Sequence, residues 1–291
     1  MNFSEILNDK NLYYVGGVVR DEFLKIDSID TDLCYEGDAI EFARKNIPQE
    51  KIIKINPDFG TVRIKTDNDE IDIASTRTEY YPRKGHLPKI KKIGCPLKDD
   101  LIRRDFTINA MAKRVANGEI IDYFKGIEDI KTKTLRILHD DSFIDDPTRI
   151  IRGLKFGIRF GFNLDSHTKN LQDNYLKNVN YDMSYHRLKK ELVEAFNINK
   201  AEVLERFIEG KMYRLLPNND FVPKIDCKRI EKLVNNCNSG HKWLMYLSLF
   251  DLSALPLTRA EKRIIEWKEK LKTQKPTNNT PTESIIISEF K

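Results

Sequence analysis

The sequence predicts an α+β protein in which a mixed β-sheet occupies the N-terminal part and helices alone form the C-terminal half. Three observations support this fold class. Short β-rich runs alternate with helical stretches up to about residue 138. From about residue 140 the apolar residues recur with helical spacing, and the strand signal fades. Residues 273–283 are polar and rich in Pro, Thr and Asn, which indicates an unfolded tail before the apolar Ile285–Ile287.

The individual elements follow from β-branched and aromatic runs, which favour strands, and from longer amphipathic runs, which favour helices. In the N-terminal part, strands are expected at Tyr13–Val15, Asp30–Tyr35, Lys51–Ile55, Thr61–Lys65 and Glu70–Ala74, with helices at Val18–Ile26 and Ala39–Asn46. In the C-terminal half, helices are expected at Asp146–Phe160, Ser166–Asn178, Ser184–Phe196, Ala201–Glu209, Arg229–Asn236 and Arg259–Lys272.

The length of 291 residues allows two or three domains. Hydrophobic residues make up 40% of the chain and charged residues 33%, a balance that excludes a wholly disordered or collagen-like protein. Fifty Lys and Arg against 45 Asp and Glu give a net charge of +5. This charge is too small to name a partner, so the positions of the charges matter more than their sum.

No apolar run approaches the roughly 18–20 residues that cross a bilayer, and the opening MNFSEILNDK lacks the basic-then-apolar order of a signal peptide. We therefore expect a cytoplasmic protein with no membrane partner. The four cysteines show no CxxC spacing and no paired His, so neither a zinc site nor a disulfide framework is expected. The oligomeric state stays open.

Two glycines, Gly16 and Gly17, end the first expected strand and open the next helix. Glycine has no Cβ, so backbone N–H groups can approach a phosphate there, and the helix N-terminus adds partial positive charge. Arg20 follows one helical turn later. The motif indicates a phosphate-binding turn, and a tight turn without a ligand is the ordinary alternative.

Two acids, Asp30 and Asp32, lie in the next expected strand, where the period of two directs both carboxylates to one face, about 7 Å apart along the chain. Hard divalent metals such as Mg²⁺ bind carboxylate and phosphate oxygens. This pair beside a phosphate-binding turn therefore indicates metal-assisted phosphoryl or nucleotidyl transfer. Asp72, flanked by Ile71 and Ile73 in another strand, is a candidate third carboxylate. Solvated surface acids are the ordinary alternative.

Basic residues gather between residues 83 and 114. They are Arg83, Lys84, Lys89, Lys91, Lys92, Lys98, Arg103, Arg104, Lys113 and Arg114, against Asp99, Asp100 and Asp105. The loop over residues 81–88 within this stretch contains Pro and Gly, and we expect it to be mobile and suited to a polyanion. A solvated basic loop is the alternative.

The last motif, DDPTR at residues 145–149, places Pro in the first turn of an expected helix. On a helical wheel an apolar arc (Ile150, Ile151, Leu154 and Ile158) adjoins a cationic arc (Arg149, Arg152, Lys155 and Arg159). Asp146 offers an acceptor for an exocyclic amine, and the guanidinium groups offer donors, which together suit the reading of a base edge. A solvated basic face is the alternative.

In this order the motifs resemble those of the class II tRNA nucleotidyltransferase and poly(A) polymerase family, which has a polymerase β-like nucleotidyltransferase head. GGVVRD at residues 16–21 matches the family's GGxVRD, and DTD at residues 30–32 matches its metal-binding DxD. RRDFTINA at residues 103–110 and DDPTR at residues 145–149 match its RRDFTINA and EDxxR. Four motifs in matching order over roughly residues 12–200 make the resemblance specific.

The resemblance implies four parts. They are a catalytic head at residues 1–138, a helical neck at 139–197 that selects the base, a helical RNA-binding body at 198–273 and a flexible tail at 274–291. Family members commonly run longer, so the body is shortened. We expect the helical half to bind phosphates of the tRNA acceptor stem, with strong salt dependence.

The resemblance also implies a reaction, the template-independent addition of CMP or AMP from CTP or ATP to the 3′ end of tRNA, as in CCA-adding enzymes. Asp30 and Asp32 would hold two Mg²⁺ ions. Asp72 would help to activate the RNA 3′-hydroxyl for attack on the α-phosphate, and pyrophosphate would leave.

The residues that the resemblance implies for nucleotide binding fall into two sets. Gly17, Arg20 and Arg104 would bind the sugar or triphosphate. Asp146 and Arg149 would pair with the Watson–Crick edge of cytosine or adenine, with Arg152 beside them, so that a wrong base leaves a buried polar group unpaired.

Three positions depart from the family pattern. Asp145 stands where the family has Glu, Lys155 stands where an Arg is common, and Ser184-Tyr185-His186-Arg187 replaces Ser-x-Glu-Arg. Lys155 keeps the positive charge but lacks the planar fork of Arg, so it does not provide a bidentate contact.

Several functions stay open at this stage. The enzyme alternatives to CCA addition are CC-only addition, A-only addition, poly(A) synthesis and transfer to a small molecule. A catalytically silent RNA-binding module is the alternative outside enzymes, and the intact pair of Asp30 and Asp32 argues against it. The loop near residues 80–96 is not deleted, which argues against a CC-only enzyme.

Overall fold

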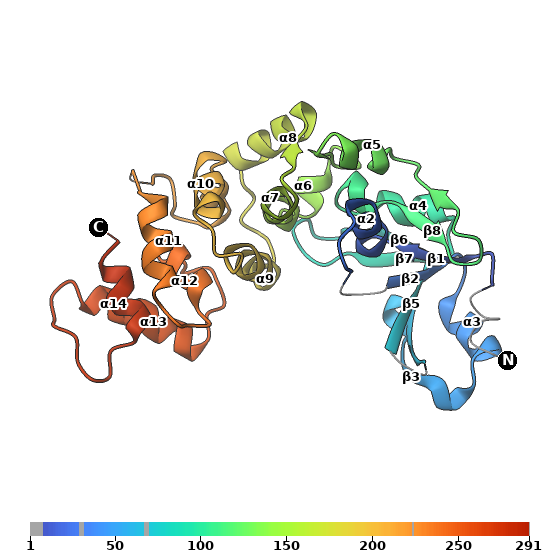
Figure 1. The fold of residues 1–291 in the computed structure, drawn as a ribbon, viewed down its shortest axis with the longest axis horizontal. Coiled ribbons are helices and arrows are strands. Elements are labelled where there is room, and N and C mark those ends of the chain that lie inside the picture. Colours follow the sequence, from blue (N-terminus) through green and yellow to red (C-terminus); the bar gives the residue numbers. More distant parts are fainter. Residues whose placement is uncertain (1–7, 29–31, 67–69, 223, 291) are drawn as a thin grey trace. The chain divides into compact units, whose positions relative to one another are not determined.

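The computed structural model describes residues 8–28, 32–66, 70–222 and 224–290 (Figure 1). The chain divides into two compact units. The N-terminal unit comprises residues 1–83, 87–142 and 163–168, and the C-terminal unit comprises residues 84–86, 143–162 and 169–291. The division into head, neck and body at residues 138, 197 and 273 stays a prediction.

Within the described residues, seven strands of the N-terminal unit form one mixed sheet in the order β3-β4-β5-β2-β1-β8-β9. They are β1 (Leu12–Val15), β2 (Asp32–Tyr35), β3 (Ile52–Asn56), β4 (Thr61–Lys65), β5 (Glu70–Ser75), β8 (Ala112–Arg114) and β9 (Ile120–Ile121). Strands β2 and β5 run parallel, and the other neighbours run antiparallel. The predicted mixed sheet is confirmed.

Further strand pairs and helices surround this sheet. Strands β6 (Arg77–Tyr80) and β7 (Lys89–Ile93) form an antiparallel ribbon, and β10 (Thr134–Leu135) pairs in parallel with β11 (Asn163–Leu164). The helices of this unit are α2 (Gly17–Leu24), α3 (Ala39–Asn46), α4 (Leu97–Ile102) and α5 (Gly126–Lys131), with short 3₁₀ turns η1 (Gln49–Lys51), η2 (Pro57–Phe59) and η3 (Thr107–Asn109).

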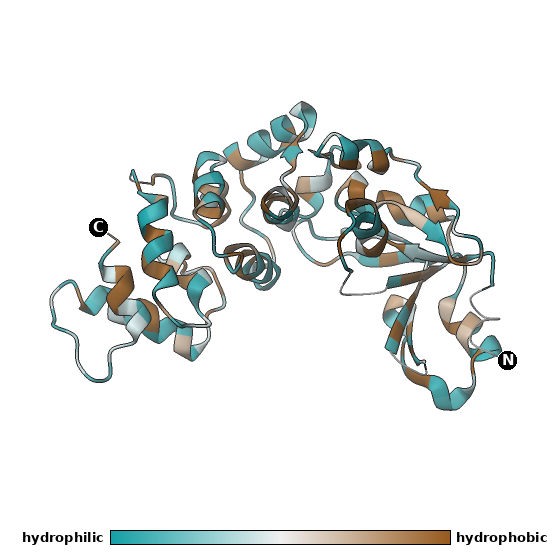
Figure 2. Ribbon diagram, viewed as in Figure 1, coloured by the Kyte–Doolittle hydropathy of each residue, from teal (hydrophilic) through white to brown (hydrophobic). Residues whose placement is uncertain are grey.

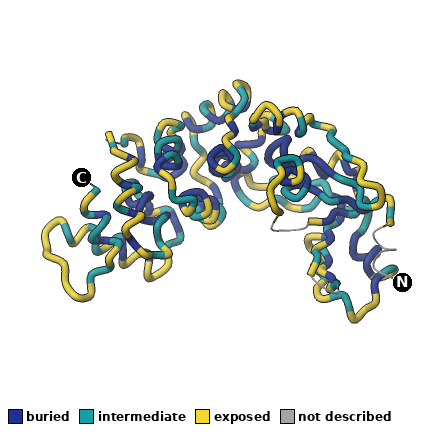
Figure 3. The backbone as a smooth tube through the Cα atoms, in the orientation of Figure 1, coloured by how far each residue is buried: buried dark blue, intermediate teal, exposed yellow. Residues whose placement is uncertain are grey.

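Side chains on β1 and β2 alternate between two apolar cores, as the period of two requires. Leu12 and Leu33 pack with residues of α3 on one face of the sheet. Tyr13 and Cys34 pack with α4 on the other face. In Figure 3 these strands are coloured dark blue over much of their length. Because Asp32 lies two residues before Cys34, its side chain belongs to the α4 face.

The C-terminal unit is helical, as the sequence predicts. Its helices are α6 (Ser142–Asp145), α7 (Thr148–Phe160), α8 (Ser166–Lys177), α9 (Tyr185–Phe196), α10 (Ala201–Glu209), α11 (Cys227–Asn235), α12 (Lys242–Leu247), α13 (Arg259–Lys270) and α14 (Thr282–Ser288), with the 3₁₀ turn η4 (Met212–Leu215). The first residues of α6 and α8 belong to the N-terminal unit. Brown apolar segments alternate with teal polar ones along these helices (Figure 2).

Aromatic side chains form much of the core of this unit. The ring centroids of Phe196 and Phe207 lie 5.3 Å apart, and those of Phe207 and Phe250 also lie 5.3 Å apart, both in edge-to-face geometry. Tyr246 packs beside Phe196 at 5.9 Å. Such pairs add about 0.5–1.5 kcal/mol each beyond the area that they bury. This core joins α9, α10 and α12.

Many predicted elements appear with nearly the expected bounds. The helices at Ala39–Asn46 and Ala201–Glu209 and the strand at Thr61–Lys65 coincide with their predictions. The beginning of the strand predicted at Asp30–Tyr35 lies outside the described residues. No helix in the described part of the chain has both the length and the apolar character that a membrane span requires.

The ends of the chain correct one expectation. The tail over residues 274–291 was predicted to be flexible, whereas residues 282–288 form helix α14, which lies beside α13 (Figure 1). Ser284 Oγ donates to the backbone oxygen of Ile264 at 2.8 Å, and Ile287 is only 4% exposed. The loop between the two helices is exposed (Figure 3). Apolar burial therefore orders a segment that its composition alone assigns to a tail.

We expect Ile287→Ala to lower the free energy of unfolding by about 2–5 kcal/mol, because it removes a buried side chain and leaves a cavity. The matched control Glu289→Ala, at an exposed position of the same segment, should change it by less than about 0.5 kcal/mol. Urea unfolding followed by circular dichroism measures both. Equal stability of the two variants would contradict the docking of α14.

Candidate active site

Two carboxylates meet on neighbouring parallel strands of the central sheet. Asp32 of β2 stands opposite Asp72 of β5 in the strand register. Both side chains are exposed, whereas Ile73, on the opposite face of β5, is 1% exposed. The predicted alternation around Asp72 is therefore confirmed. Asp30, the other predicted metal ligand, lies outside the described residues.

The carboxylate of Asp72 is bound by a guanidinium group from the next strand. Arg63 of β4 stands opposite Asp72, its Nε donates to Oδ1 at 2.8 Å, and its Nη2 donates to Oδ2 at 2.7 Å. These hydrogen bonds hold the pKa of Asp72 below its usual value. A carboxylate with a lowered pKa is a poor proton acceptor but a permanent negative charge.

The glycine turn begins directly beside this pair. Tyr14 of β1 stands opposite Leu33 of β2, so continuing the antiparallel register by one residue sets Val15 opposite Asp32. Gly16 follows with a φ of 73°, which is the left-handed region that favours glycine, and α2 begins at Gly17. The turn and the carboxylates therefore occupy one end of adjacent strands.

Two guanidinium groups converge on this turn. A Cβ built on Gly16 would lie 2.8 Å from Arg104 Nη1, and one on Gly17 would lie 3.4 Å from Arg20 Nη2. The sequence predicted that Gly17, Arg20 and Arg104 act together, and the structure brings all three to the same turn. A side chain at Gly16 would displace the guanidinium group of Arg104.

Hydrogen bonds join the two motifs that supply these residues. Arg20 Nη1 donates to Asn109 Oδ1 at 2.6 Å, and Asn109 Nδ2 donates to Asp105 Oδ1 at 2.9 Å. Arg20 Nε also donates to Asp21 Oδ1 at 2.8 Å. Four of these side chains, Arg20, Asp21, Asp105 and Asn109, are buried, so the network fixes Arg20 at the turn.

Arg104 is held differently. Its Nη2 donates to Asp100 Oδ2 at 3.1 Å, and its Nε is buried with no hydrogen-bond partner among the described residues. Asp100 is fully buried and also accepts from Arg103 Nη2 at 2.8 Å. Burial raises the pKa of Asp100, but the charges of Arg104 and Arg103 outweigh it and hold that pKa below its usual value. Asp100 therefore holds the guanidinium group of Arg104 beside Gly16.

The acidic residues suit a hard divalent metal in donor chemistry. Asp32 and Asp72 supply carboxylate oxygens, the ligands that Mg²⁺ prefers. Among the described residues, no group of three or more His, Cys, Asp and Glu side chains could hold a metal ion. Asp30, the third predicted acid, is outside that part of the chain. The oxygen donors that are described therefore fit Mg²⁺, and its binding stays a proposal.

The remaining predicted site residues lie in the C-terminal unit. Asp146 is 5% exposed, and its Oδ1 accepts from Thr148 Oγ1 at 2.6 Å and from the Thr148 backbone N–H at 3.2 Å, at the start of α7. Its Oδ2 accepts from Arg187 of α9. Arg149, the second residue of α7, is 4% exposed. The Asp146 carboxylate is therefore already oriented by the protein.

The cationic arc of α7 is not a solvated face. Lys155 is 6% exposed, its Nζ donates to Glu191 Oε2 at 2.8 Å, and it also binds Glu194. Arg152 Nη1 donates to the other oxygen of Glu191 at 3.2 Å. Glu191 and Glu194 belong to α9, so these charges join two helices. The sequence alternative of a solvated basic face is wrong for this part of α7.

The loop expected to be mobile is packed at its centre. Gly85 is buried, its N–H donates to the backbone oxygen of Asp145 at 3.0 Å, and its oxygen accepts from the Ser184 N–H at 2.9 Å. A Cβ on Gly85 would lie 2.9 Å from the Cβ of Met183, so the positive φ of 78° and the space both require glycine. Lys84 binds the Asp145 carboxylate. Backbone pairing across long sequence separations therefore fixes residues 84–86 within the C-terminal unit.

Sequence reasoning missed two contributors to this region. Arg187 binds Asp146, and its Nη1 also donates to the backbone oxygen of His86 at 3.2 Å. Glu191 accepts from Lys155 and Arg152. The signal for Arg187 was present in the family motif, whereas nothing in the chain order pointed to Glu191. His186, the departure from that motif, is exposed.

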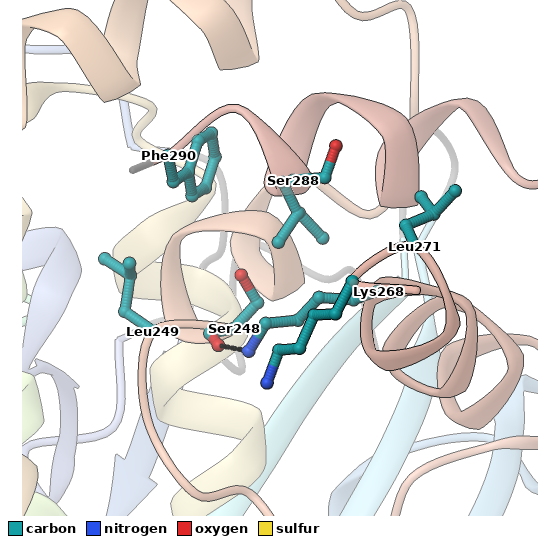
Figure 4. Close-up of a pocket in the computed structure, with 8 residues that line it drawn as sticks. Ser248, Leu249, Lys268, Leu271, Ser288 and Phe290 are labelled. Carbon is teal, nitrogen blue, oxygen red and sulfur yellow. Dashed lines mark hydrogen bonds between the residues drawn. The ribbon is translucent and has the colours of Figure 1, made fainter. Parts of the chain in front are cut away.

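A cavity of about 230 Å³ lies elsewhere in the C-terminal unit (Figure 4). Its lining comprises four apolar residues, two serines and two lysines, which are Leu249, Leu271, Ile287, Phe290, Ser248, Ser288, Lys268 and Lys272. Lys268 Nζ donates to the backbone oxygen of Ser248 at 2.6 Å. Burial lowers the pKa of Lys268. None of the predicted site residues lines this cavity.

Comparison with known proteins finds similarity first in the N-terminal part. Residues 12–136 match the poly A polymerase head domain. The chain is 46% identical over 164 residues to the A-adding tRNA nucleotidyltransferase of Aquifex aeolicus. The aligned region covers 55% of this chain and 20% of that protein. It is 39% identical over 207 residues to the A-adding tRNA nucleotidyltransferase of Halalkalibacterium halodurans, covering 67% and 48% respectively.

Other relatives are named CCA-adding enzymes. That of Bacillus pumilus is 32% identical over 210 residues, covering 70% of this chain and 51% of that protein. The chain thus spans between about a fifth and a half of the length of these curated relatives.

Solved structures extend the similarity to both units. A CCA-adding enzyme in its apo form gives a TM-score of 0.79 at 29% identity, covering 95% of this chain and 74% of that one. The complex of a CCA-adding enzyme with CTP gives a TM-score of 0.77 at 27% identity, covering 98% of this chain and 76% of that one. A tRNA nucleotidyltransferase complexed with a primer tRNA and an incoming ATP analog gives a TM-score of 0.70 at 26% identity, covering 96% of this chain and 91% of that one.

We expect Arg63→Gln to raise the pKa of Asp72 toward its ordinary value, because the hydrogen bonds that favour the ionised carboxylate are lost. The folded pKa lies below the unfolded one, so the contribution of Asp72 to stability is present above the unfolded pKa and is lost as the pH falls through the folded pKa. Carboxyl ¹³C NMR titration measures the shift, with Arg44→Gln as an exposed control. An unchanged pKa in Arg63→Gln would contradict the assignment.

Proposed function

We propose that this protein is a tRNA nucleotidyltransferase that transfers a nucleoside monophosphate, AMP in the first place, from a nucleoside triphosphate to the 3′ end of tRNA. The observation that carries the proposal is the pairing of Asp32 with Asp72 directly beside the glycine turn. Anionic groups next to a cationic, glycine-bounded turn suit a reaction in which a triphosphate and a hydroxyl nucleophile meet.

Arg20 and Arg104 would bind the triphosphate. Their guanidinium groups lie against Gly16 and Gly17, where a phosphate can approach the backbone. Planar guanidinium groups bind phosphate oxygens bidentately, which fixes the α-phosphate for in-line attack. The hydrogen bonds to Asn109 and Asp21 hold the guanidinium group of Arg20 at the turn.

Asp72 would orient the RNA 3′-hydroxyl and would not act as a strong base, because Arg63 keeps it ionised and lowers its pKa. Asp30 and Asp32 would hold Mg²⁺, which when bound supplies charge neutralisation at the phosphate oxygens. The 3′-hydroxyl oxygen then forms a bond to the α-phosphorus, the bond from that phosphorus to pyrophosphate breaks, and the hydroxyl proton passes to solvent.

Base selection would rest on Asp146 and Arg149. Both are buried, so a mismatched base edge would leave a polar group unpaired, at a cost of about 1–3 kcal/mol. Arg187 and Thr148 orient the Asp146 carboxylate and leave few geometries open to it. Arg152, which binds Glu191, would act by positioning α7 and not by touching the base.

The choice of AMP rests on similarity. The two A-adding relatives described above are 46% and 39% identical, against 32% for the CCA-adding relative. CCA addition is the second candidate, favoured by the solved complexes of CCA-adding enzymes with ATP and with CTP, which match at TM-scores of 0.74 and 0.77.

One assay separates these functions. The protein is incubated with Mg²⁺, labelled ATP or CTP, and tRNA that lacks CCA, tRNA that ends in CC, or RNA with an unrelated tail. We expect AMP addition to tRNA ending in CC and no CMP addition. CMP addition to tRNA lacking CCA would establish the second candidate, and long tails on unrelated RNA would indicate poly(A) synthesis. If no RNA gains a nucleotide, the proposed function is wrong.

The same assay tests the carboxylate site. Asp32→Asn should reduce addition by at least about 1,000-fold, because a carboxylate that neutralises transition-state charge is lost. Asp58→Asn, at an exposed position of η2, is the matched control and should keep full activity. Unfolding curves confirm that both variants fold. Activity of Asp32→Asn equal to that of the control would refute the assignment.

We expect Arg187→Ala to lower kcat/KM for the correct nucleotide about 10–100-fold, since a charged hydrogen bond that orients Asp146 is worth about 1.5–3 kcal/mol. The ratio of correct to incorrect nucleotide should fall as well. His186→Ala, exposed on the same helix, is the control. An unchanged selectivity ratio would show that Arg187 serves folding alone.

A further inference from the structure

The cations of the basic stretch over residues 83–114 fall into two groups, those that form ion pairs with carboxylates and those that are solvated. Carboxylates lie within ion-pair distance of five of its cations, which are Lys84, Arg103, Arg104, Lys113 and Arg114. Lys98 lies over the ring of Tyr123, with its Nζ 5.8 Å from the centroid. The apparent polycation of the sequence is therefore much smaller in the folded protein.

Three lysines of β7 keep their charges in solvent. Lys89, Lys91 and Lys92 are exposed, and within the described residues no carboxylate lies within ion-pair distance of any of them. Lys89 and Lys91 lie two residues apart, which in a strand is about 7 Å along one face, and Lys92 adjoins Lys91, so β7 carries several cations and not a single binding point.

The ribbon is irregular at this row. Thr78 pairs with Lys92 and Glu79 pairs with Ile90, so Lys91 has no partner in the register. A bulge of this kind re-aims side chains and increases the local twist. It also blocks regular pairing of β7 with another strand. The lysine row is therefore better suited to a ligand that binds through side chains than to an added strand.

The ribbon is tied to the proposed triphosphate site within the N-terminal unit. Arg77 of β6 donates its backbone N–H to Asp100 Oδ1 at 3.1 Å, and Arg103 Nη1 donates to Glu79 Oε1 at 2.9 Å. Asp100 also binds Arg104, which lies at the glycine turn. The buried carboxylate of Asp100 therefore links the β6–β7 ribbon, which carries the three lysines, to the arginine at the glycine turn.

We propose that Lys89, Lys91 and Lys92 bind backbone phosphates of the RNA whose 3′ end enters the site. A line of solvated cations suits a polymer with regularly spaced phosphates, whereas a triphosphate is served by Arg20 and Arg104. The contacts carry no base information, so the row binds any RNA end that fits the turn. This inference rests on the proposed function for the identity of the partner.

The triple variant Lys89→Gln, Lys91→Gln and Lys92→Gln tests the row, with Lys10→Gln, Lys45→Gln and Lys131→Gln as the control. The control residues are exposed lysines of the same unit and remove the same charge. Binding of labelled tRNA is measured from 50 to 200 mM salt. Each phosphate contact contributes about 0.7–0.9 to the slope of log affinity against log salt concentration. The magnitude of this slope should therefore fall by about 2–3 in the triple variant.

The control should keep the wild-type slope, and the KM for ATP should stay unchanged in both proteins because Arg20 and Arg104 are intact. Equal slopes for the triple variant and its control would overturn the proposal. Lys89→Gln and Lys92→Gln alone should each lower the slope by about 0.7–0.9, so the test survives poor folding of the triple variant. Binding is read without nucleotide addition, so wild-type protein that binds tRNA but adds nothing would refute only the proposed function.

Discussion

A fully buried carboxylate, Asp100, fixes the cationic side of the candidate active site. It accepts from Arg103 and Arg104, which directly follow α4, and from the backbone of Arg77 in β6. Burying a charge is costly unless it is paired and hydrogen-bonded, so each partner is needed, and losing one partner of a buried pair costs about 3–5 kcal/mol. The position of Arg104 at the glycine turn follows from this constraint, and so does the frame that holds the lysine row of β7.

The C-terminal unit uses charge in the same way. Glu191 joins Arg152 and Lys155 of α7 to α9, and Arg187 joins α9 to Asp146. Arg152 and Lys155, which the sequence suggests as ligand-binding cations, therefore form ion pairs that join two helices. In the proposed function, the small, oriented set of groups around Asp146 would read the nucleotide base, because discrimination between similar bases requires such fixed partners.

Much of the fold was predictable because it follows from local periodicity. The alternation around Asp72 and the apolar stripes of α3 and α10 appear as expected, since burial of one face is the main requirement of such elements. The β6–β7 ribbon was not predictable, because three of the five residues of β7 are Lys, which is depleted in strands. The burial of Gly85 and the docking of α14 depend on partners about 60–100 and 20 residues away in the chain, which no local pattern reports.

The sequence by itself determined the chemical inventory: the acids at residues 30, 32 and 72, the glycine turn, and the Asp146 and Arg149 pair, because those side-chain types in that order are what the chemistry needs. The tertiary structure decided which charged groups form ion pairs within the protein and which face solvent. Asp72 is bound by Arg63, Lys155 by two carboxylates and Lys84 by Asp145, whereas the lysines of β7 face solvent. Pairing depends on distances of a few ångströms between elements that are far apart in the chain, and only folding sets those distances.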